Sequence, residues 1–155
     1  MNALAEIVEN KAGTPLTAFE PKIIAMVCNW CTYTAADLAG TSRLMYPSNV
    51  RIVRLMCTGM IDSKYILKAF FDGADGVFIG GCHPGDCHYI NGNLKAVKRI
   101  TGVRKLLEQF GFDPARLKLQ WIGASEGPEF QRHMTEFVST VRALGPNPAR
   151  DCMIL

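Results

Sequence analysis

Four short apolar runs recur along the chain from Lys22 onward, and each is bounded by polar or turn-forming residues. Their length and continuous hydrophobicity are typical of strands that are buried on both faces, as in the middle of a parallel sheet. The predicted strands cover residues 23–27, 50–56, 77–79 and 117–122.

Apolar residues at helical spacing fill the segments between and after these strands. The predicted helices span residues 34–46, about 62–72, about 89–110 and 128–144. Asp62 is suited to cap the second of them, and Gly111 and Gly145 are suited to end the last two. The predicted inward face of the third helix consists of Leu94, Val97, Ile100, Leu106, Leu107 and Phe110.

Strands that alternate with helices predict an α/β fold, with a parallel sheet covered by helices on both faces. Right-handed crossovers favour a flavodoxin-like open sheet of four strands in the order 2-1-3-4. In such sheets ligands bind beyond the carboxyl ends of the strands, where the winding direction reverses. The 155 residues divide into an amino-terminal arm (1–21), one α/β domain (22–145) and a carboxyl-terminal tail (146–155).

Composition excludes several classes of protein. With 48% hydrophobic and 20% charged residues, the chain is expected to fold around a core. No apolar stretch approaches the roughly 20 residues of a membrane helix, and the start resembles no signal or transit peptide, so a cytoplasmic protein is expected. A net charge of +3 gives no support for nucleic-acid binding. The basic stretch 95–105 is either a solvated helix face or a surface that docks an acidic partner.

Cysteine is the unusual part of the composition, with six residues in a chain that needs no disulfides for its stability. Five of them follow the predicted strands at their carboxyl ends, where the fold is expected to hold a ligand. These five are Cys28, Cys31, Cys57, Cys82 and Cys87. The sixth, Cys152, heads a Cys-Met-Ile-Leu sequence that has the form of a prenylation box. We interpret it as a free thiol of the tail.

The spacing of the five thiols indicates a thiolate-bound metal site. Cys28 and Cys31 form a CxxC motif, Cys57 stands alone, and Cys82 and Cys87 form a CxxxxC motif. Three alternatives remain open at this point. His83 and His88 permit a Rieske-like site, four cysteines permit structural zinc in a protein that only joins two others, and a CxxC before a helix permits thiol–disulfide chemistry.

Three segments carry a resemblance to a known family. They are the sequence from Val27 to Cys31, the Gly-Gly-Cys-His-Pro-Gly-Asp-Cys-His-Tyr loop at 80–89, and LKLQWIGASEG at 117–127. Together they resemble the delta subunit of methyl-viologen-reducing hydrogenase, and the likeness runs from about residue 19 to residue 145.

The resemblance implies an electron-transfer subunit with a 2Fe–2S cluster and no catalytic site of its own. It implies a hydrogenase small subunit, or a formate dehydrogenase, as electron donor. It also implies an electron acceptor, the flavin-bearing A-subunit of heterodisulfide reductase. That reductase is an enzyme of methanogenesis. Cys28, Cys31, Cys57, Cys82 and Cys87 become candidates for four ligand positions. We expect Cys57 to be the surplus one, because the other four form two pairs along the sequence.

Overall fold

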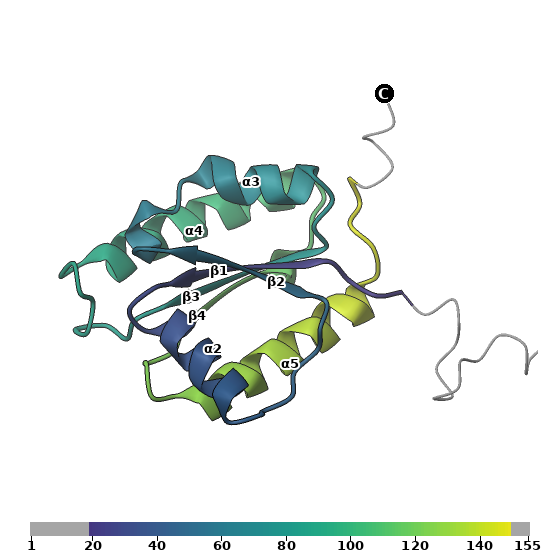
Figure 1. Cartoon of the computed structure of the whole chain (residues 1–155). Helices are drawn as coiled ribbons and strands as arrows, with labels where there is room; N and C mark the ends of the chain where they lie inside the picture. Colours follow the sequence, from purple (N-terminus) through teal and green to yellow (C-terminus); the bar gives the residue numbers. More distant parts are fainter. Residues whose placement is uncertain (1–18, 150–155) are drawn as a thin grey trace, which may run out of the picture.

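The computed structural model describes residues 19–149, in which four parallel strands form one sheet in the order β2-β1-β3-β4 (Figure 1). The predicted α/β architecture and strand order are therefore confirmed. The strands are β1 (Ile23–Cys28), β2 (Val50–Leu55), β3 (Gly76–Gly81) and β4 (Leu117–Trp121). The helices are α2 (Thr32–Thr41), α3 (Ser63–Phe71), α4 (Gly92–Gln109) and α5 (Gly127–Leu144), with short 3₁₀ turns η1 (Thr58–Met60) and η2 (Pro114–Arg116). None of these helices is long and apolar enough to cross a membrane.

Helices α3 and α4 cover one face of the sheet, and α2 and α5 cover the other (Figure 1). Side chains alternate between the two faces along a strand, so β1 supplies both layers of the core. Ile23 and Ala25 pack against α5, whereas Met26 packs beneath α3 and α4. This burial on both faces explains the continuous apolar runs of the sequence.

The helix predicted for residues 34–46 begins earlier and ends at Thr41, so the prediction is wrong at its carboxyl end. Arg43 adopts a positive φ of 55°, which stops the helix, and the Leu44 N–H closes the turn on the carbonyl of Ala39. Met45, which lies within the predicted helix, is 82% exposed. Residues 42–49 therefore form a loop that leads into β2.

The third predicted helix, α4, starts at Gly92 instead of Tyr89. Ile90 has a positive φ of 70°, a conformation that cannot continue into a helix. The predicted inward face is also partly wrong, because Leu94 and Phe110 are exposed. The buried positions are Asn93, Ala96, Ile100, Val103 and Leu107. The capping predictions are confirmed: Asp62 accepts a hydrogen bond from Lys64 N, and Gly111 and Gly145 follow α4 and α5 with positive φ.

A buried polar network ties the chain together at the amino ends of the strands. The carboxylate of Asp75 accepts hydrogen bonds from the backbone N–H groups of Lys22 (2.7 Å) and Asn147 (2.8 Å). The Arg116 guanidinium donates to four carbonyl oxygens, which belong to Asp75, Leu144, Gly145 and Pro146. Packed structure thus continues to residue 149, beyond the boundary predicted at residue 145. Residues 1–18 of the predicted arm and 150–155 of the tail, with Cys152, lie outside the described residues.

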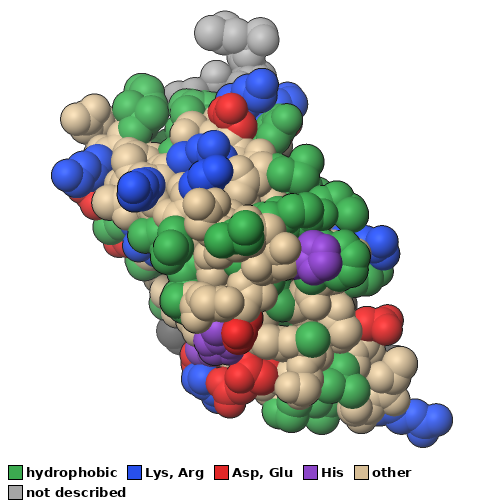
Figure 2. Space-filling model, turned by 90° about the vertical axis from the view of Figure 1, so that its left-hand side faces the viewer, with side chains coloured by type: hydrophobic (Ala, Val, Ile, Leu, Met, Phe, Trp, Pro, Cys, Tyr) green, Lys and Arg blue, Asp and Glu red, His purple; other side chains and the backbone are tan. Residues whose placement is uncertain are grey.

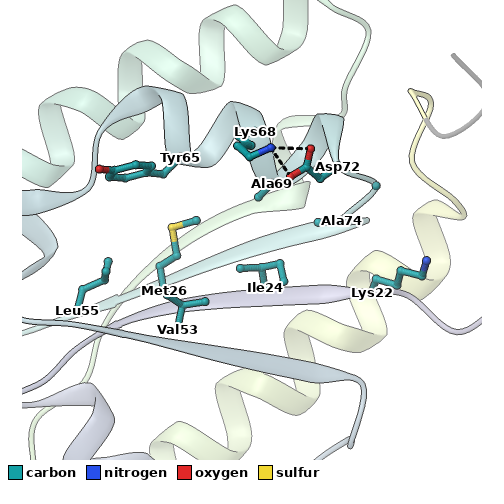
Figure 3. A pocket seen from close by; sticks show the side chains of 11 residues that line it. Lys22, Ile24, Met26, Val53, Leu55, Tyr65, Lys68, Ala69, Asp72 and Ala74 are labelled. Atoms are coloured by element: carbon teal, nitrogen blue, oxygen red, sulfur yellow. Dashed lines mark hydrogen bonds and ion pairs between the residues drawn. The ribbon is translucent and has the colours of Figure 1, made fainter. Parts of the chain in front are cut away.

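The edge strand β2 and helix α3 enclose an apolar hollow of about 500 Å³ (Figure 3). Ile24, Met26, Val53 and Leu55 line its sheet side, and Tyr65 extends over it from α3. An ion pair between Lys68 and Asp72 (2.8 Å) stands at its rim. None of its lining residues is a cysteine, so this hollow lies apart from the thiols.

Replacement of Arg116 by Met should lower the free energy of unfolding by about 3 kcal/mol, because it leaves buried carbonyl oxygens without a donor. Urea denaturation measures the loss. Arg142→Met is the matched control, since Arg142 forms an exposed ion pair with Glu20 that is worth at most about 1 kcal/mol. Equal losses in the two variants would contradict a special role for the Arg116 network.

Candidate metal centre

The carboxyl ends of the three neighbouring strands β2, β1 and β3 deliver the thiols to one edge of the sheet. Cys28 is the last residue of β1, and Cys31 is the N-cap of α2. Cys57 precedes η1, Cys82 directly follows β3, and Cys87 lies in the loop before α4. All five are buried, and none of these five forms a disulfide.

Three of the thiols form a compact group. The Sγ atoms of Cys28, Cys31 and Cys82 all lie within 4.8 Å of one another, and those of Cys28 and Cys82 are 3.7 Å apart. Two sulfurs bound to one tetrahedral zinc, at about 2.3 Å each, lie about 3.8 Å apart. The group therefore has the size of a thiolate site for a metal.

The other two thiols form a pair. The Sγ atoms of Cys57 and Cys87 are 3.9 Å apart, a separation that again suits two thiolates on one tetrahedral metal. The structure thus groups the cysteines differently from the sequence motifs. Cys82 lies with the CxxC motif, and its partner in the CxxxxC motif, Cys87, lies with Cys57.

A close backbone contact makes room for the Cys57–Cys87 pair. A Cβ atom on Gly92 would lie 2.2 Å from the sulfur of Cys57 and 3.3 Å from that of Cys87. A Cβ atom on Gly59 would lie 2.8 Å from the Cα of Gly92. Only glycine at both positions lets the first turn of α4 approach η1 so closely. The space beside the two sulfurs therefore depends on two residues without side chains.

The three grouped thiols cannot all ionise without a positive charge nearby. A hydrogen bond from the Cys31 thiol lowers the pKa of Cys28 to about 5. The same interaction, together with burial, raises the pKa of Cys31. Burial and the neighbouring Cys28 charge raise the pKa of Cys82 to about 11. A bound cation would stabilise all three as thiolates, which is the protonation state that ligates metals.

Backbone N–H groups favour negative charge at the Cys57–Cys87 pair. Burial opposes ionisation of both thiols and raises the pKa of Cys57. At Cys87, N–H groups of Asn93, Tyr89 and Gly92 outweigh burial and lower the pKa. These donors belong to the amino end of α4 and the loop before it, where the helix dipole also favours an anion. Gly59 N donates to the Cys57 sulfur at 3.3 Å.

Polar side chains hold the cysteine loops in place. The buried Asn93 amide donates to the carbonyl oxygens of Cys82 (3.0 Å) and His83 (2.9 Å). Nε2 of His83 lies 2.9 Å from a carboxylate oxygen of Glu126, which also accepts the N–H of Gly123. That N–H bond, followed by the interaction with His83, lowers the pKa of Glu126.

An aromatic stack joins the two cysteine motifs on the surface. The rings of Trp30 and His88 are parallel within 16°, with centroids 3.9 Å apart. Trp30 is 42% exposed, so it is not the core residue that tryptophan usually is. Figure 2 views this end of the molecule, where hydrophobic side chains spread across the middle, Lys and Arg gather above, and Asp and Glu surround a His below.

Sequence reasoning singled out the five thiols but missed the residues that shape their surroundings. Gly59, Gly92 and Asn93 carry no recognisable motif, because their roles arise from a contact between η1 and α4. Of the two histidines next to the thiols, His83 pairs through its side chain with Glu126, and the His88 ring stacks on Trp30. In the basic stretch, Arg99 and Arg104 donate to backbone carbonyls, whereas Lys95 and Lys98 remain exposed.

A family model described as methyl-viologen-reducing hydrogenase, delta subunit, matches residues 23–145, which is most of the chain and all of the strands and helices above. The chain belongs to this family. A similar curated protein is the F420-non-reducing hydrogenase iron–sulfur D-subunit of Archaeoglobus profundus, 51% identical over 128 residues that cover 83% of this chain and 93% of that protein. The vhu iron–sulfur D-subunit of the F420-non-reducing hydrogenase of Methanocaldococcus jannaschii is 45% identical over 131 residues, which cover 84% and 98%.

A second kind of relative is a much longer protein. The A-subunit of the ferredoxin:CoB-CoM heterodisulfide reductase of Methanosarcina mazei is 41% identical over 140 residues, which cover 90% of this chain and 18% of that protein. The A-subunit of the ferredoxin/F(420)H(2)-dependent enzyme of Methanosarcina acetivorans is 44% identical over 126 residues, which cover 81% and 16%. In these two proteins a module similar to this chain belongs to the same polypeptide as the rest of the A-subunit.

Replacement of Gly92 by Ala should disturb the loop that carries Cys87 and lower metal binding, because the new Cβ would lie 2.2 Å from the Cys57 sulfur and 3.3 Å from that of Cys87. Metal analysis after reconstitution measures the effect. Gly102→Ala on the same helix is the matched control: nothing lies within 4 Å of its Cβ, and it should stabilise the fold by up to about 1 kcal/mol. Full metal content in Gly92→Ala would contradict the proposed packing constraint.

Proposed function

We propose that the protein is an electron-transfer subunit that holds an iron–sulfur cluster and performs no substrate chemistry of its own. The observation that carries the proposal is the gathering of five free, buried thiols at one edge of the sheet. Two further findings support the proposal: the chain belongs to a hydrogenase subunit family, and similar proteins are named iron–sulfur subunits.

The proposed cofactor is a 2Fe–2S cluster, which needs four thiolates and supplies a one-electron carrier when bound. Two features of the site fit it. In the compact group, the sulfurs of Cys28 and Cys82 are separated by the distance expected of two thiolates on one metal ion. At Cys87, backbone N–H groups favour the negative charge of a thiolate cluster.

For the four ligands we propose Cys28, Cys31, Cys82 and Cys87, with Cys57 as the surplus thiol. The first three form the compact group. Cys87 is favoured over Cys57 because the backbone N–H groups of Asn93, Tyr89 and Gly92 lower its pKa, whereas burial raises the pKa of Cys57. The spacing of the sulfurs also supports a second set, Cys28, Cys82, Cys57 and Cys87, in which Cys31 is surplus.

For the partners we propose a hydrogenase small subunit, or a formate dehydrogenase, as donor and the A-subunit of heterodisulfide reductase as acceptor, in the cytoplasm. The names of the hydrogenase relatives support the first. The Methanosarcina proteins support the second, because a module that shares a polypeptide with the A-subunit stays beside it permanently. The chain would then pass electrons into the reductase.

Iron, zinc and acid-labile sulfide should be measured in the protein purified without oxygen, with a visible spectrum before and after dithionite. We expect two irons and two sulfides per chain and a brown colour that bleaches on reduction. One zinc without sulfide would replace the proposal with a structural adaptor. A metal-free protein with a reactive Cys28–Cys31 pair would replace it with thiol–disulfide chemistry.

Cys57→Ser and Cys31→Ser distinguish the two ligand sets, because both thiols are buried and only one is surplus. We expect Cys57→Ser to keep two irons and an unchanged spectrum, and Cys31→Ser to lose the cluster or change its spectrum. Cys87→Ser should lose it under either set. The reverse result for the first two variants would make Cys57 a ligand and Cys31 the surplus thiol.

A further inference from the structure

Exposed apolar side chains surround the Cys57–Cys87 end of the site. A hollow of about 280 Å³ opens there and reaches Cys57, with Met56, Met60 and Tyr89 in its wall. Ile90 and Leu94 stand beside it in the loop before α4 and in the first turn of that helix. All five side chains are between 46% and 85% exposed. We call Met56, Met60, Tyr89, Ile90 and Leu94 the apolar patch.

Ile90 is the member of the apolar patch that costs the chain the most stability. Its φ of 70° is disfavoured for a β-branched residue, and its side chain is 85% exposed. Glycine or asparagine would suit this backbone position better. Isoleucine therefore contributes nothing to the stability of the chain alone, but it offers a projecting apolar side chain to another surface. A cluster of this kind beside a buried site is typical of a docking face.

The charges at the rim of the apolar patch are basic. Lys95 is the charged residue that lines the hollow, and Lys98 follows on the exposed side of α4. Arg99, in contrast, donates to the carbonyl oxygens of Gly59 (2.6 Å) and Ile61 (3.0 Å) and thereby holds η1 in place. A complementary partner therefore has an apolar centre and carboxylates opposite Lys95 and Lys98.

A second hollow of about 310 Å³ reaches the compact group of thiols and has a different character. Its lining includes Trp30, Cys31 and Cys82 together with the polar side chains of His83, Asp86 and His88. Faces between permanent partners are more apolar than those between transient ones. The apolar patch therefore suits a partner that stays bound. The second hollow, which we call the polar hollow, suits a partner that binds transiently.

We infer that the apolar patch is the docking face for the acceptor, the A-subunit of heterodisulfide reductase. The inference rests on the proposed function, in which that protein is the acceptor, and on the Methanosarcina relatives, in which a similar module shares a polypeptide with the A-subunit. It predicts that electrons leave beside Cys57 and Cys87, while the donor docks elsewhere, at the polar hollow. The electron that departs to the acceptor then crosses the apolar patch, from which the two partners exclude water.

The test uses Leu94→Glu in the apolar patch and Met45→Glu as control. A carboxylate in the first turn of α4 suits the helix dipole, so Leu94→Glu should fold normally and yet repel the carboxylates of the acceptor. Met45 is 82% exposed and lies in the loop that leads into β2, at the opposite edge of the sheet. Binding of the purified reductase A-subunit is measured by calorimetry, and hydrogen-dependent reduction by the hydrogenase is measured separately with cluster-loaded protein.

We expect Leu94→Glu to weaken binding of the reductase A-subunit about tenfold or more, a typical effect at a central interface position. Reduction by the hydrogenase should stay unchanged, and Met45→Glu should alter neither. Ile90→Gly should raise the melting temperature and still weaken binding, a combination that a purely structural role of Ile90 does not produce.

Two failures have different signatures. If the wild-type protein binds the reductase A-subunit and Leu94→Glu binds it equally well, the docking face alone is overturned. The same holds if Leu94→Glu loses reduction by the hydrogenase and keeps binding of the acceptor. A wild-type protein that neither binds the acceptor nor carries electrons from the hydrogenase would overturn the proposed function, and the docking face with it.

Discussion

The thiol site depends on one electrostatic constraint, which is that neighbouring buried thiols resist ionising together. Three sulfurs lie within 4.8 Å of one another in a buried site, and their mutual influence spreads their pKa values widely. All of them become thiolates together only beside a cation. The fold therefore maintains a group of thiols whose joint ionisation is unfavourable and would be stabilised by a bound metal. Its rigidity comes from the sheet below and from the contacts of η1 with α4.

Stability and function occupy opposite edges of the same sheet. At the amino ends of the strands, Asp75 and Arg116 bind both termini of the domain with buried hydrogen bonds. At the carboxyl ends, the backbone contact between Gly59 and Gly92 and the amide of Asn93 position the cysteine loops. Because the first network closes the domain without using the thiols, the site is free to be shaped by its ligand and its partners.

The thiol site is reached from two sides of different chemistry, and this asymmetry suits a relay. One approach is apolar with lysines at its rim, and the other carries histidine and aspartate. A carrier with two identical approaches would not distinguish donor from acceptor. The Trp30–His88 stack bridges the two cysteine loops at this surface.

The sequence by itself determined the fold class, the strand order and the convergence of five thiols, because buried parallel strands are continuous apolar runs and their carboxyl ends meet at one edge. It placed the boundaries of α2 and α4 wrongly, since the positive φ of Arg43 and Ile90 depends on loop contacts that no local pattern encodes. Only the tertiary structure decided that Cys82 lies with Cys28 and Cys31 while Cys57 lies with Cys87. The physical reason is that strand order and the Gly59–Gly92 contact, and not spacing along the chain, set the distances between side chains.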